Sequence, residues 1–558
     1  MKPTQTLQAA TGDEPASCTK HRKDVPMNIT SAPKSSAANS KTTAPAGLSY
    51  EEQGAQLEAR VSIALAMGGE DKLAQRRASG DLNARERIEQ LLDAGSFSEA
   101  GMLAVSVVPA DRETSPADAK ITGTGRIEGR RVAVVSNDMT VKGASSSAVN
   151  MRKIGRLKET ATRNGMPLIF LGESSGSRVP DSLGAEAMAA AGQDPQQYCR
   201  RRETPWVSAV LGPCLGSSTW YTCLSDFVVM RKGAFLAVSS ARVTSLAIGE
   251  AVDPEELGGW KLHAEQTGLV DMVVNSDAEA LAAIRRFLSY LPSHAGARSP
   301  SQPAAEAIAP DAHKLLDLVP AARSKTYDMR KVIAGIVDDG SFFNLKDRFG
   351  RAAVTGLARL NGESVGIVAS NPMFKGGAMD PDACRKVSSF LVLCDSFNIP
   401  IVFLVDTPGF LVGIEGERKG APAHIMNMIH AVQLCSVPKL SVIMRKSYGQ
   451  AYINMGGGRN SDEVAAWTSA DVSFMDPQIG VSVLYGIKRE DDPERFDRLK
   501  AELARDTSAY ALAGAFGVQS VIAPKQTRTW LIEGLATHRR ERNGGIGQHE
   551  MRSWPTYI

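Results

Sequence analysis

The chain resembles itself, and this repeat limits its fold more than any other feature of the sequence. Glycines and prolines recur with one constant separation along the chain, which we call the main repeat spacing: Gly129 and Gly362, Pro167 and Pro400, Pro205 and Pro438, and Gly216 and Gly449. Flanking segments repeat with a second, slightly larger spacing, which relates Gly95 to Gly340 and Asp226 to Asp471. Similar apolar strands alone would not give a constant spacing, so the sequence predicts two homologous domains.

Each half alternates short apolar runs with longer amphipathic segments. Runs such as 168–171, 401–405 and 440–444 are typical of buried strands, whereas 151–163 and 425–435 have helical periodicity. This alternation predicts an α/β fold built from crossover units.

The composition of the connecting segments predicts the domain boundaries. Residues 1–47 are rich in Ser, Thr, Lys, Pro and Ala and are expected to be a disordered tail. A transit peptide is the weaker alternative, because Asp13, Glu14 and Asp24 have the wrong charge for one. The remaining chain divides into an N-terminal domain at 48–297, a linker at 298–311 and a C-terminal domain at 312–558.

Composition excludes several functional classes. A net charge of +3 over 558 residues does not suggest a nucleic-acid binder. The seven cysteines lack the spacing of a structural zinc site or a disulfide framework, so reduced thiols and no bound metal are expected. No apolar run is long enough to span a membrane. We therefore expect a cytoplasmic protein.

Motifs for metalloprotease or phosphate chemistry are absent from the sequence. There is no HExxH, Walker loop or helix-opening GxGxxG, and His263 is interpreted as structural. Instead, small residues follow the strands at 207–211 and 440–444, around Gly216 and Gly449. Small residues let a ligand approach the backbone, and amides at a helix start favour negative charge.

The preceding strands end in the same way, around Gly176 and Gly409. Any single glycine of this kind more often serves packing at a tight turn. Four such turns at equivalent places in a duplicated domain favour ligand binding, and two amides aimed at one oxygen would form an oxyanion hole.

Several segments together resemble a known family. They are ARERIEQLLDAGSF (84–97), ITGTGRIEGRRVAVVSND (121–138), PEELGGWKLH (254–263), CDSFNIPIVFLVDTPGFLVG (394–413) and VPKLSVIMRKSYGQAY (437–452). Combined and in this order, they resemble the carboxyltransferase β subunits of propionyl-CoA, acetyl-CoA and methylcrotonyl-CoA carboxylases. The resemblance runs from about residue 48 to the C-terminus.

The resemblance implies two crotonase-like (ClpP/crotonase) domains, each a β-β-α superhelix. It implies that the N-terminal half binds acyl-CoA and that the C-terminal half binds carboxybiotin, with the biotin on a separate carrier chain. Carboxyl transfer would pass through an enolate of the acyl thioester. The implied partners are a biotin carboxylase with its biotin carboxyl carrier subunit and further copies of this chain, in a hexamer.

Site residues follow from the same resemblance. The catalytic amides would be those of Gly216 and Ser217 for the thioester oxygen, and those of Gln450 and Ala451 for the biotin oxygen. Gly143, Gly176, Gly409 and Ile453 would contact substrate, and Gly449 and Tyr448 would contact the cofactor. No metal is implied in this subunit.

The chain departs from the family at these turns. The family usually has Gly-Gly-Ala where this chain has Gly216-Ser217-Ser218 and Gly449-Gln450-Ala451. Trp220 stands where a smaller aromatic residue is common. These side chains predict a divergent acyl substrate or reduced activity. Alternative functions are a biotin-dependent decarboxylase or transcarboxylase subunit, and a non-catalytic scaffold in a carboxylase complex.

Overall fold

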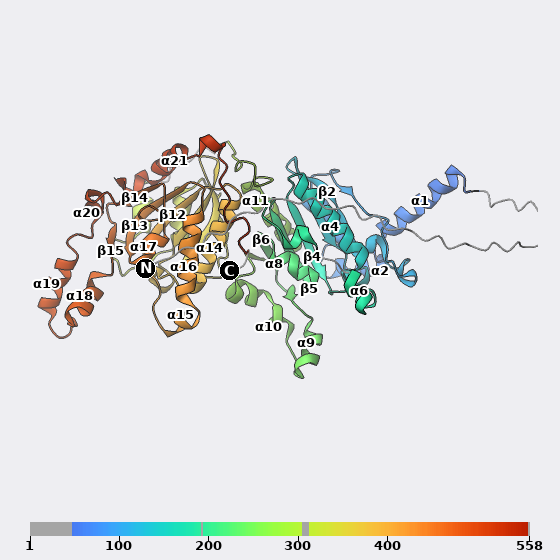
Figure 1. Cartoon of the computed structure of the whole chain (residues 1–558), viewed down its shortest axis with the longest axis horizontal. Coiled ribbons are helices and arrows are strands. Elements are labelled where there is room, and N and C mark those ends of the chain that lie inside the picture. Colours follow the sequence, from blue (N-terminus) through green and yellow to red (C-terminus); the bar gives the residue numbers. More distant parts are fainter. Residues whose placement is uncertain (1–46, 191–193, 304–311, 556–558) are drawn as a thin grey trace, which may run out of the picture. The chain divides into compact units, whose positions relative to one another are not determined.

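A computed structural model describes residues 47–190, 194–303 and 312–555. Most of the expected tail, residues 1–46, and most of the expected linker, residues 304–311, therefore lie outside the described part of the chain. A short N-terminal unit ends at Ala55, and one large unit runs from Gln56. The large unit contains two sheets, coloured blue to green and yellow to red in Figure 1.

The first sheet has the order β1-β2-β3-β4-β5-β6-β8, and β7 pairs with β5 beyond the end of β6. Its strands are β1 (Ser98–Glu99), β2 (Lys120–Ile127), β3 (Arg130–Asn137), β4 (Leu168–Ser174), β5 (Trp206–Leu215), β6 (Phe227–Arg231), β7 (Phe235–Ala237) and β8 (Met272–Val274). From β3 onward the pairs are parallel, as crossover units require.

The second sheet repeats this plan in the order β9-β10-β11-β12-β13-β14-β16, and β15 pairs with β13. Its strands are β9 (Phe343–Leu345), β10 (Ala353–Leu360), β11 (Glu363–Ser370), β12 (Ile401–Thr407), β13 (Lys439–Tyr448), β14 (Glu463–Trp467), β15 (Asp471–Ser473) and β16 (Ser520–Ile522). The repeat in the sequence is thus a repeat of sheet topology, and the predicted α/β class is confirmed.

The helices fall between the same strands in each half. Those up to the second sheet are α1 (Tyr50–Leu65), α2 (Glu70–Ala78), α3 (Ala84–Leu91), α4 (Ala148–Arg163), α5 (Val179–Ser182), α6 (Ala185–Ala190), α7 (Pro195–Tyr198), α8 (Ser217–Cys223), α9 (Ala241–Ile248), α10 (Pro254–Gly258), α11 (Asp277–Tyr290), α12 (Ala312–Leu318) and α13 (Met329–Ile336). Those that follow are α14 (Pro381–Ser396), α15 (Ile414–Arg418), α16 (Ala421–Leu434), α17 (Gln450–Asn454), α18 (Pro477–Tyr485), α19 (Pro493–Leu503), α20 (Ala509–Gly514) and α21 (Thr527–Thr537).

Each sheet contains one antiparallel hairpin whose turn chemistry is visible in the sequence. Glu128 and Gly129 connect β2 to β3, and Asn361 and Gly362 connect β10 to β11. All four residues have positive φ, between 51° and 80°. Two consecutive residues of this kind match the twist of a two-residue hairpin and fix its register.

The central strands are longer than the sequence predicts. The apolar runs end at residues 211 and 444, but β5 continues to Leu215 and β13 to Tyr448. Each strand gains a second partner there: β5 leaves β6 and pairs with β7, and β13 leaves β14 and pairs with β15. The second partner satisfies the backbone groups of these extensions, so each strand continues beyond its apolar run.

Candidate functional site

A glycine with positive φ ends each long central strand and begins a short helix. Gly216 (φ 59°) lies between β5 and α8, and Gly449 (φ 61°) lies between β13 and α17. A Cβ atom on Gly449 would lie 3.1 Å from the carbonyl oxygen of Phe474. The conformation and the close approach explain why glycine occupies both positions.

Unpaired backbone amides follow each of these glycines. The first helical bonds run from Thr219 N–H to the Gly216 carbonyl (2.9 Å) and from Tyr452 N–H to the Gly449 carbonyl (3.1 Å). The preceding amides, of residues 217–218 and 450–451, therefore have no acceptor within their helices. The Gly449 amide is different, because it donates to the Ser473 carbonyl of β15 (3.0 Å).

In the first half, two further turns pack against Gly216. The Ser175 amide donates to the Gly143 carbonyl (2.9 Å), and the Ser146 amide donates to the Gly176 carbonyl (2.8 Å). A Cβ atom on Gly216 would lie 3.4 Å from the Cα of Gly176. We call Gly143, Gly176, Gly216 and their immediate neighbours the first turn cluster.

The second half repeats this arrangement. The Met379 amide donates to the Gly409 carbonyl (3.0 Å), and a Cβ atom on Gly409 would lie 3.7 Å from the Tyr448 carbonyl oxygen. Gly376 (φ 63°) takes the place of Gly143 (φ 60°) at the main repeat spacing. We call Gly376, Gly409, Gly449 and their neighbours the second turn cluster. Gly376 is missing from the candidate residues, although the repeat marks its position.

The predicted site residues thus fall into two groups. Gly143, Gly176, Gly216 and Ser217 belong to the first turn cluster, and Gly409, Tyr448, Gly449, Gln450, Ala451 and Ile453 belong to the second. Among the described residues, no hydrogen bond or ion pair joins one cluster to the other.

The second-cluster side chains differ in exposure. Tyr448 is buried and its hydroxyl donates to Asp471, so only its backbone borders the Gly409 turn. The side chain of Gln450 is exposed and donates to Asn454 Oδ1 (3.2 Å). Ile453 is 38% exposed on the same helix. Ala451 is buried.

A buried carboxylate lies beneath each cluster, and sequence reasoning missed both. Glu173, at the end of β4, accepts from Arg87 (3.0 Å) and Arg76 (3.1 Å). Asp406, at the end of β12, accepts from Arg445 (2.9 Å) and from the hydroxyl of Tyr327 (3.0 Å). The two carboxylates are again related by the main repeat spacing, so the repeat was the available signal.

A second buried ion pair fixes the first turn cluster. Arg178 bonds Asp118 (2.7 Å), and Asp118 accepts the amide of Asn150 (3.1 Å) at the start of α4. Lys120 donates to the Ala144 carbonyl (2.6 Å), next to Gly143. Complete burial lowers the pKa of Lys120 to about 7.

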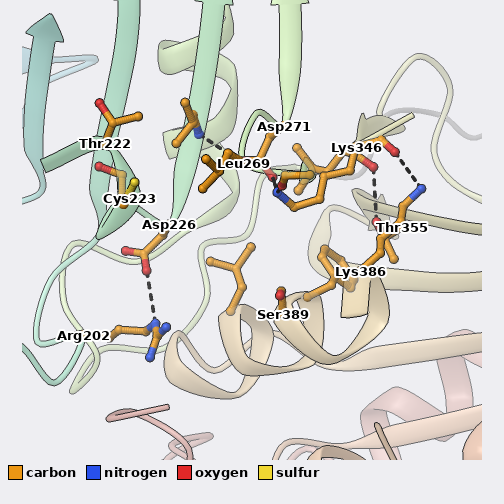
Figure 2. A pocket seen from close by; sticks show the side chains of 16 residues that line it. Arg202, Thr222, Cys223, Asp226, Leu269, Asp271, Lys346, Thr355, Lys386 and Ser389 are labelled. Carbon is orange, nitrogen blue, oxygen red and sulfur yellow. Dashed lines mark hydrogen bonds and ion pairs between the residues drawn. The ribbon is translucent and has the colours of Figure 1, made fainter. Parts of the chain in front are cut away.

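A separate cavity of about 40 Å³ lies where segments of the two halves meet. Figure 2 shows its polar walls, in which Arg202 and Asp226 form an ion pair and Lys346 reaches Asp271. The glycines of the two turn clusters do not line it. Its volume suits one or a few water molecules, so we do not regard it as the site.

Other candidate chemistry is not found in the described residues. His263 is buried with Nε2 2.7 Å from the Leu236 carbonyl oxygen, in agreement with a structural role. No group of His, Cys, Asp and Glu side chains in the described ranges could hold a metal ion. Likewise, none of the described helices is long and apolar enough to cross a membrane.

These features define a class of protein. Duplicated α/β halves with free amide donors at equivalent turns are typical of proteins that stabilise negative charge on a ligand. Within that class, the chain belongs to the carboxyl transferase family, because the carboxyl transferase domain matches residues 75–545.

The relatives agree with this assignment. A putative propionyl-CoA carboxylase beta chain of Bacillus subtilis (strain 168) is 36% identical and covers 85% of this chain and 94% of its own length. The methylmalonyl-CoA carboxyltransferase 12S subunit of Propionibacterium freudenreichii subsp. shermanii is 33% identical, with 87% and 94% covered. The methylmalonyl-CoA decarboxylase subunit alpha of Veillonella parvula is 31% identical, with 86% and 94% covered.

A solved structure shows the same fold. Transcarboxylase 12S, a hexamer with methylmalonyl-coenzyme A and methylmalonic acid bound, superposes with a TM-score of 0.82 at 32% identity. The match covers 88% of this chain and 96% of that one. The predicted pair of crotonase-like domains and the predicted membership of the carboxyltransferase family are confirmed.

Proposed function

We propose that this chain is the carboxyltransferase subunit of a biotin-dependent acyl-CoA carboxylase. It transfers a carboxyl group from carboxybiotin to the α-carbon of an acyl-CoA thioester. The observation that carries the proposal is the pair of glycine-capped turns, after which the amides of Ser217, Gln450 and Ala451 have no acceptor within their helices. The relatives named for propionyl-CoA and methylmalonyl-CoA support the substrate class.

The first turn cluster holds the acyl thioester in this proposal. The amides of Gly216 and Ser217 donate to the thioester oxygen, which becomes negative when the α-proton leaves. Gly143 and Gly176 let the substrate approach the backbone. Losing one such donor typically raises a barrier by about 3 kcal/mol.

The second turn cluster holds the ureido oxygen of biotin through the amides of Gln450 and Ala451. The Gly449 amide is already paired with Ser473, which leaves these two amides as the next donors along the chain. Phe410 is partly exposed and gives this cluster an apolar side chain that fits the carbon skeleton of the biotin ring. Bound carboxybiotin would supply carbon dioxide and the base that accepts the α-proton. The amides then stabilise the charge left on that oxygen, and a new bond joins the substrate α-carbon to carbon dioxide.

Each half binds one of the two ligands, and other chains supply the biotin. Residues 48–297 form the acyl-CoA side, 312–558 form the carboxybiotin side, and 298–311 connect them. The biotin carboxylase and the biotin carrier are separate chains, and we place the assembly in the cytoplasm.

Further copies of this chain complete the site, in a hexamer like that of transcarboxylase 12S. Two exposed apolar helix faces at repeat-equivalent places support self-association. They belong to α9, with Val243, Leu246 and Ile248, and to α18, with Ile479, Val483 and Leu484. Large exposed apolar patches of this kind mark association surfaces.

The test is ATP-dependent fixation of labelled bicarbonate into acyl-CoA by the chain purified with its biotinylated partner. We expect labelled carboxyacyl-CoA that is lost when biotin is blocked with avidin. The Veillonella relative makes decarboxylation the second candidate, which predicts release of carbon dioxide from methylmalonyl-CoA and no fixation. If neither reaction occurs and acyl-CoA does not bind, the scaffold alternative replaces both.

A further inference from the structure

The turn that contains Gly143 recurs in the second half, but its last residue differs. Residues 142–144 and 375–377 all have positive φ and are related by the main repeat spacing. The last position is Ala144 (φ 49°) in the first half and Gly377 (φ 86°) in the second. Glycine adopts such a conformation freely, whereas in residues with a Cβ atom it costs about 1–2 kcal/mol. Ala144 therefore needs interactions that stabilise a strained backbone.

A hydroxyl group at the end of the neighbouring strand fixes this turn in both halves. Ser174 Oγ, at the end of β4, donates to the Ala144 carbonyl (3.0 Å), and Thr407 Oγ1, at the end of β12, donates to the Gly377 carbonyl (2.8 Å). The donors and the acceptors are both related by the main repeat spacing. This hydrogen bond belongs to the backbone plan that the halves share, so it does not compensate for the strain that is specific to Ala144.

The first half adds a second donor to the same carbonyl. Lys120 Nζ donates to the Ala144 carbonyl (2.6 Å), whereas the main repeat spacing places Ala353 at the equivalent position of the second half. Lys120 is 1% exposed, and the nearby carboxylate of Asp118 is already bonded by Arg178 (2.7 Å). Burying an ammonium group costs stability unless a carboxylate pairs with it. Among the described residues no ion pair compensates Lys120, so a role at the site explains its presence better than a role in folding.

Charged and titratable groups from several elements surround Lys120. They are Asp118 in the preceding turn, Arg178 after β4, Lys153 on α4 and Cys214 on β5. Burial lowers the pKa of Lys120 to about 7 and that of Lys153 to about 8, and it raises the pKa of the Cys214 thiol to about 12, so this thiol stays neutral. Lys120 therefore changes its charge near neutral pH, and its hydrogen bond to the turn is strongest when it is charged.

The turn that carries this carbonyl is connected to the proposed thioester hole. The Ser175 amide donates to the Gly143 carbonyl (2.9 Å), and the Ser146 amide donates to the Gly176 carbonyl (2.8 Å). A Cβ atom on Gly216 would lie 3.4 Å from the Cα of Gly176. A shift of the turn would therefore move the backbone against which the substrate lies.

We propose that Lys120 is a positioning residue that fixes the Gly143 turn for the binding of acyl-CoA. This inference rests on the proposed function, because it assumes that the acyl thioester lies at the first turn cluster. Lys120 is buried, so it acts through the backbone and not on the reacting atoms. Its loss should therefore weaken substrate binding more than it slows the chemical step. The second half has alanine at this place, so biotin binding should not respond.

The experiment measures binding and turnover separately for Lys120→Met, in the chain purified with its biotinylated partner. The probe is propionyl-CoA, the thioester in the name of the Bacillus relative. Methionine fills a similar volume but cannot donate a hydrogen bond. We expect Kd and KM for propionyl-CoA to rise by about tenfold at pH 6, with kcat changed by less than about threefold. KM for free biotin, in the reverse transfer from saturating methylmalonyl-CoA, should keep its wild-type value.

The pH dependence distinguishes a charged hydrogen bond from packing. Lys120 is charged below pH 7 and neutral above it. The ratio of the variant Kd to the wild-type Kd should therefore be largest at pH 6 and shrink by pH 8. Because the ratio is taken at each pH, the titration of Lys153 and of the CoA phosphates cancels. A ratio that stays constant or grows with pH would contradict the role of the ammonium group.

A matched control and a second test variant accompany Lys120→Met. Lys386→Met is the control, since Lys386 is also buried with its pKa lowered to about 7 but lies in the second half, and its Kd for propionyl-CoA should equal the wild-type value. Ser174→Ala removes the other donor to the Ala144 carbonyl and should raise Kd in the same direction as Lys120→Met. Thermal unfolding of each variant at pH 6 shows whether weaker binding reflects a loss of fold.

The outcomes separate this inference from the proposed function. An unchanged Kd in Lys120→Met, or an equal rise in Lys386→Met, would overturn the inference and leave carboxyl transfer standing. Weaker binding in Lys120→Met, together with no carboxylation by the wild type, would support the inference and overturn the proposed reaction. An absence of acyl-CoA binding by the wild type would overturn both.

Discussion

The two halves neutralise an equivalent buried carboxylate with arginines from different elements. A carboxylate is buried at the end of β4 as Glu173 and at the end of β12 as Asp406. Arg76 and Arg87, from helices before the first sheet, neutralise Glu173. Arg445, from the neighbouring strand β13, neutralises Asp406. The repeat therefore preserves the backbone and the buried negative charge, but not the source of the positive charge.

One repeat position explains the difference. Arg445 occupies the place that Gly212 has in the first half, at the main repeat spacing. A Cβ atom on Gly212 would lie 2.6 Å from Glu173 Oε1, so the longer acid excludes a side chain there. The space that Arg445 fills in one half is taken by Glu173 in the other. Substitutions at these two neighbouring positions should therefore be energetically coupled.

The largest effect is predicted for a variant that removes the simpler of the two ion pairs, Arg445 with Asp406. Arg445→Met leaves Asp406 with a tyrosine hydroxyl, a backbone amide and the more distant Lys446 ammonium (3.9 Å) as partners, and should lower the free energy of unfolding by about 3–5 kcal/mol. Arg87→Met should cost less, because Arg76 still bonds Glu173 and Arg231 still bonds Asp277.

Urea unfolding of both variants, with the exposed Arg498→Met as a control, measures this difference. A larger loss for Arg87→Met would show that the network in the first half is not redundant.

The next prediction compares the two proposed oxyanion holes. Proline at the first position of a helix removes one amide N–H and keeps the helix. Ser217→Pro and Gln450→Pro should each lower the rate of carboxyl transfer by about 10²–10³ with little loss of stability.

Glu70→Pro is the control, since it also follows a glycine with positive φ at the start of a helix, α2. Steady-state rates and thermal unfolding should be measured together. Wild-type rates in either test variant would show that its amide does not contact the reacting oxygen.

The smallest predicted effect is a change in stability on replacing two buried lysines, one in each half. Burial lowers the pKa of both Lys120 and Lys386 to about 7. Lys386 donates to three carbonyls, those of residues 346, 349 and 353, whereas Lys120 has one carbonyl acceptor, that of Ala144. Lys120→Met should stabilise the fold by about 1–3 kcal/mol at pH 6, and Lys386→Met should destabilise it.

The pH dependence gives the sign of the Lys120 effect. Its pKa is about 7 in the folded chain and 10.5 in the unfolded chain, so the unfolded state binds more protons between these values. Stability of the wild type therefore rises as the pH increases from 7 towards 10. The advantage of Lys120→Met should be full below pH 7 and shrink above it. Thermal midpoints at pH 6 and pH 9 check this, and an advantage that grows with pH would contradict it.

Much of the architecture was predictable because it depends on spacing. The repeat gave two α/β halves and the positions of Gly216 and Gly449. It could not give the ends of β5 and β13, since the change of strand partner depends on contacts between distant segments. For the same reason it could not show that the hydroxyl of Tyr448 is bound to Asp471. The assignment of amides to particular oxygens stays a prediction.

The change of strand partner along β13 affects which substitutions the residues after Gly449 can tolerate. The glycine at the end of β13 is anchored on both sides, because its amide donates to Ser473 of β15 and its carbonyl accepts the Tyr452 amide of α17. The residues after it can therefore vary in chemistry while the peptide groups keep their orientation. Such a frame accommodates glutamine in place of a small residue directly after the glycine without rebuilding the scaffold.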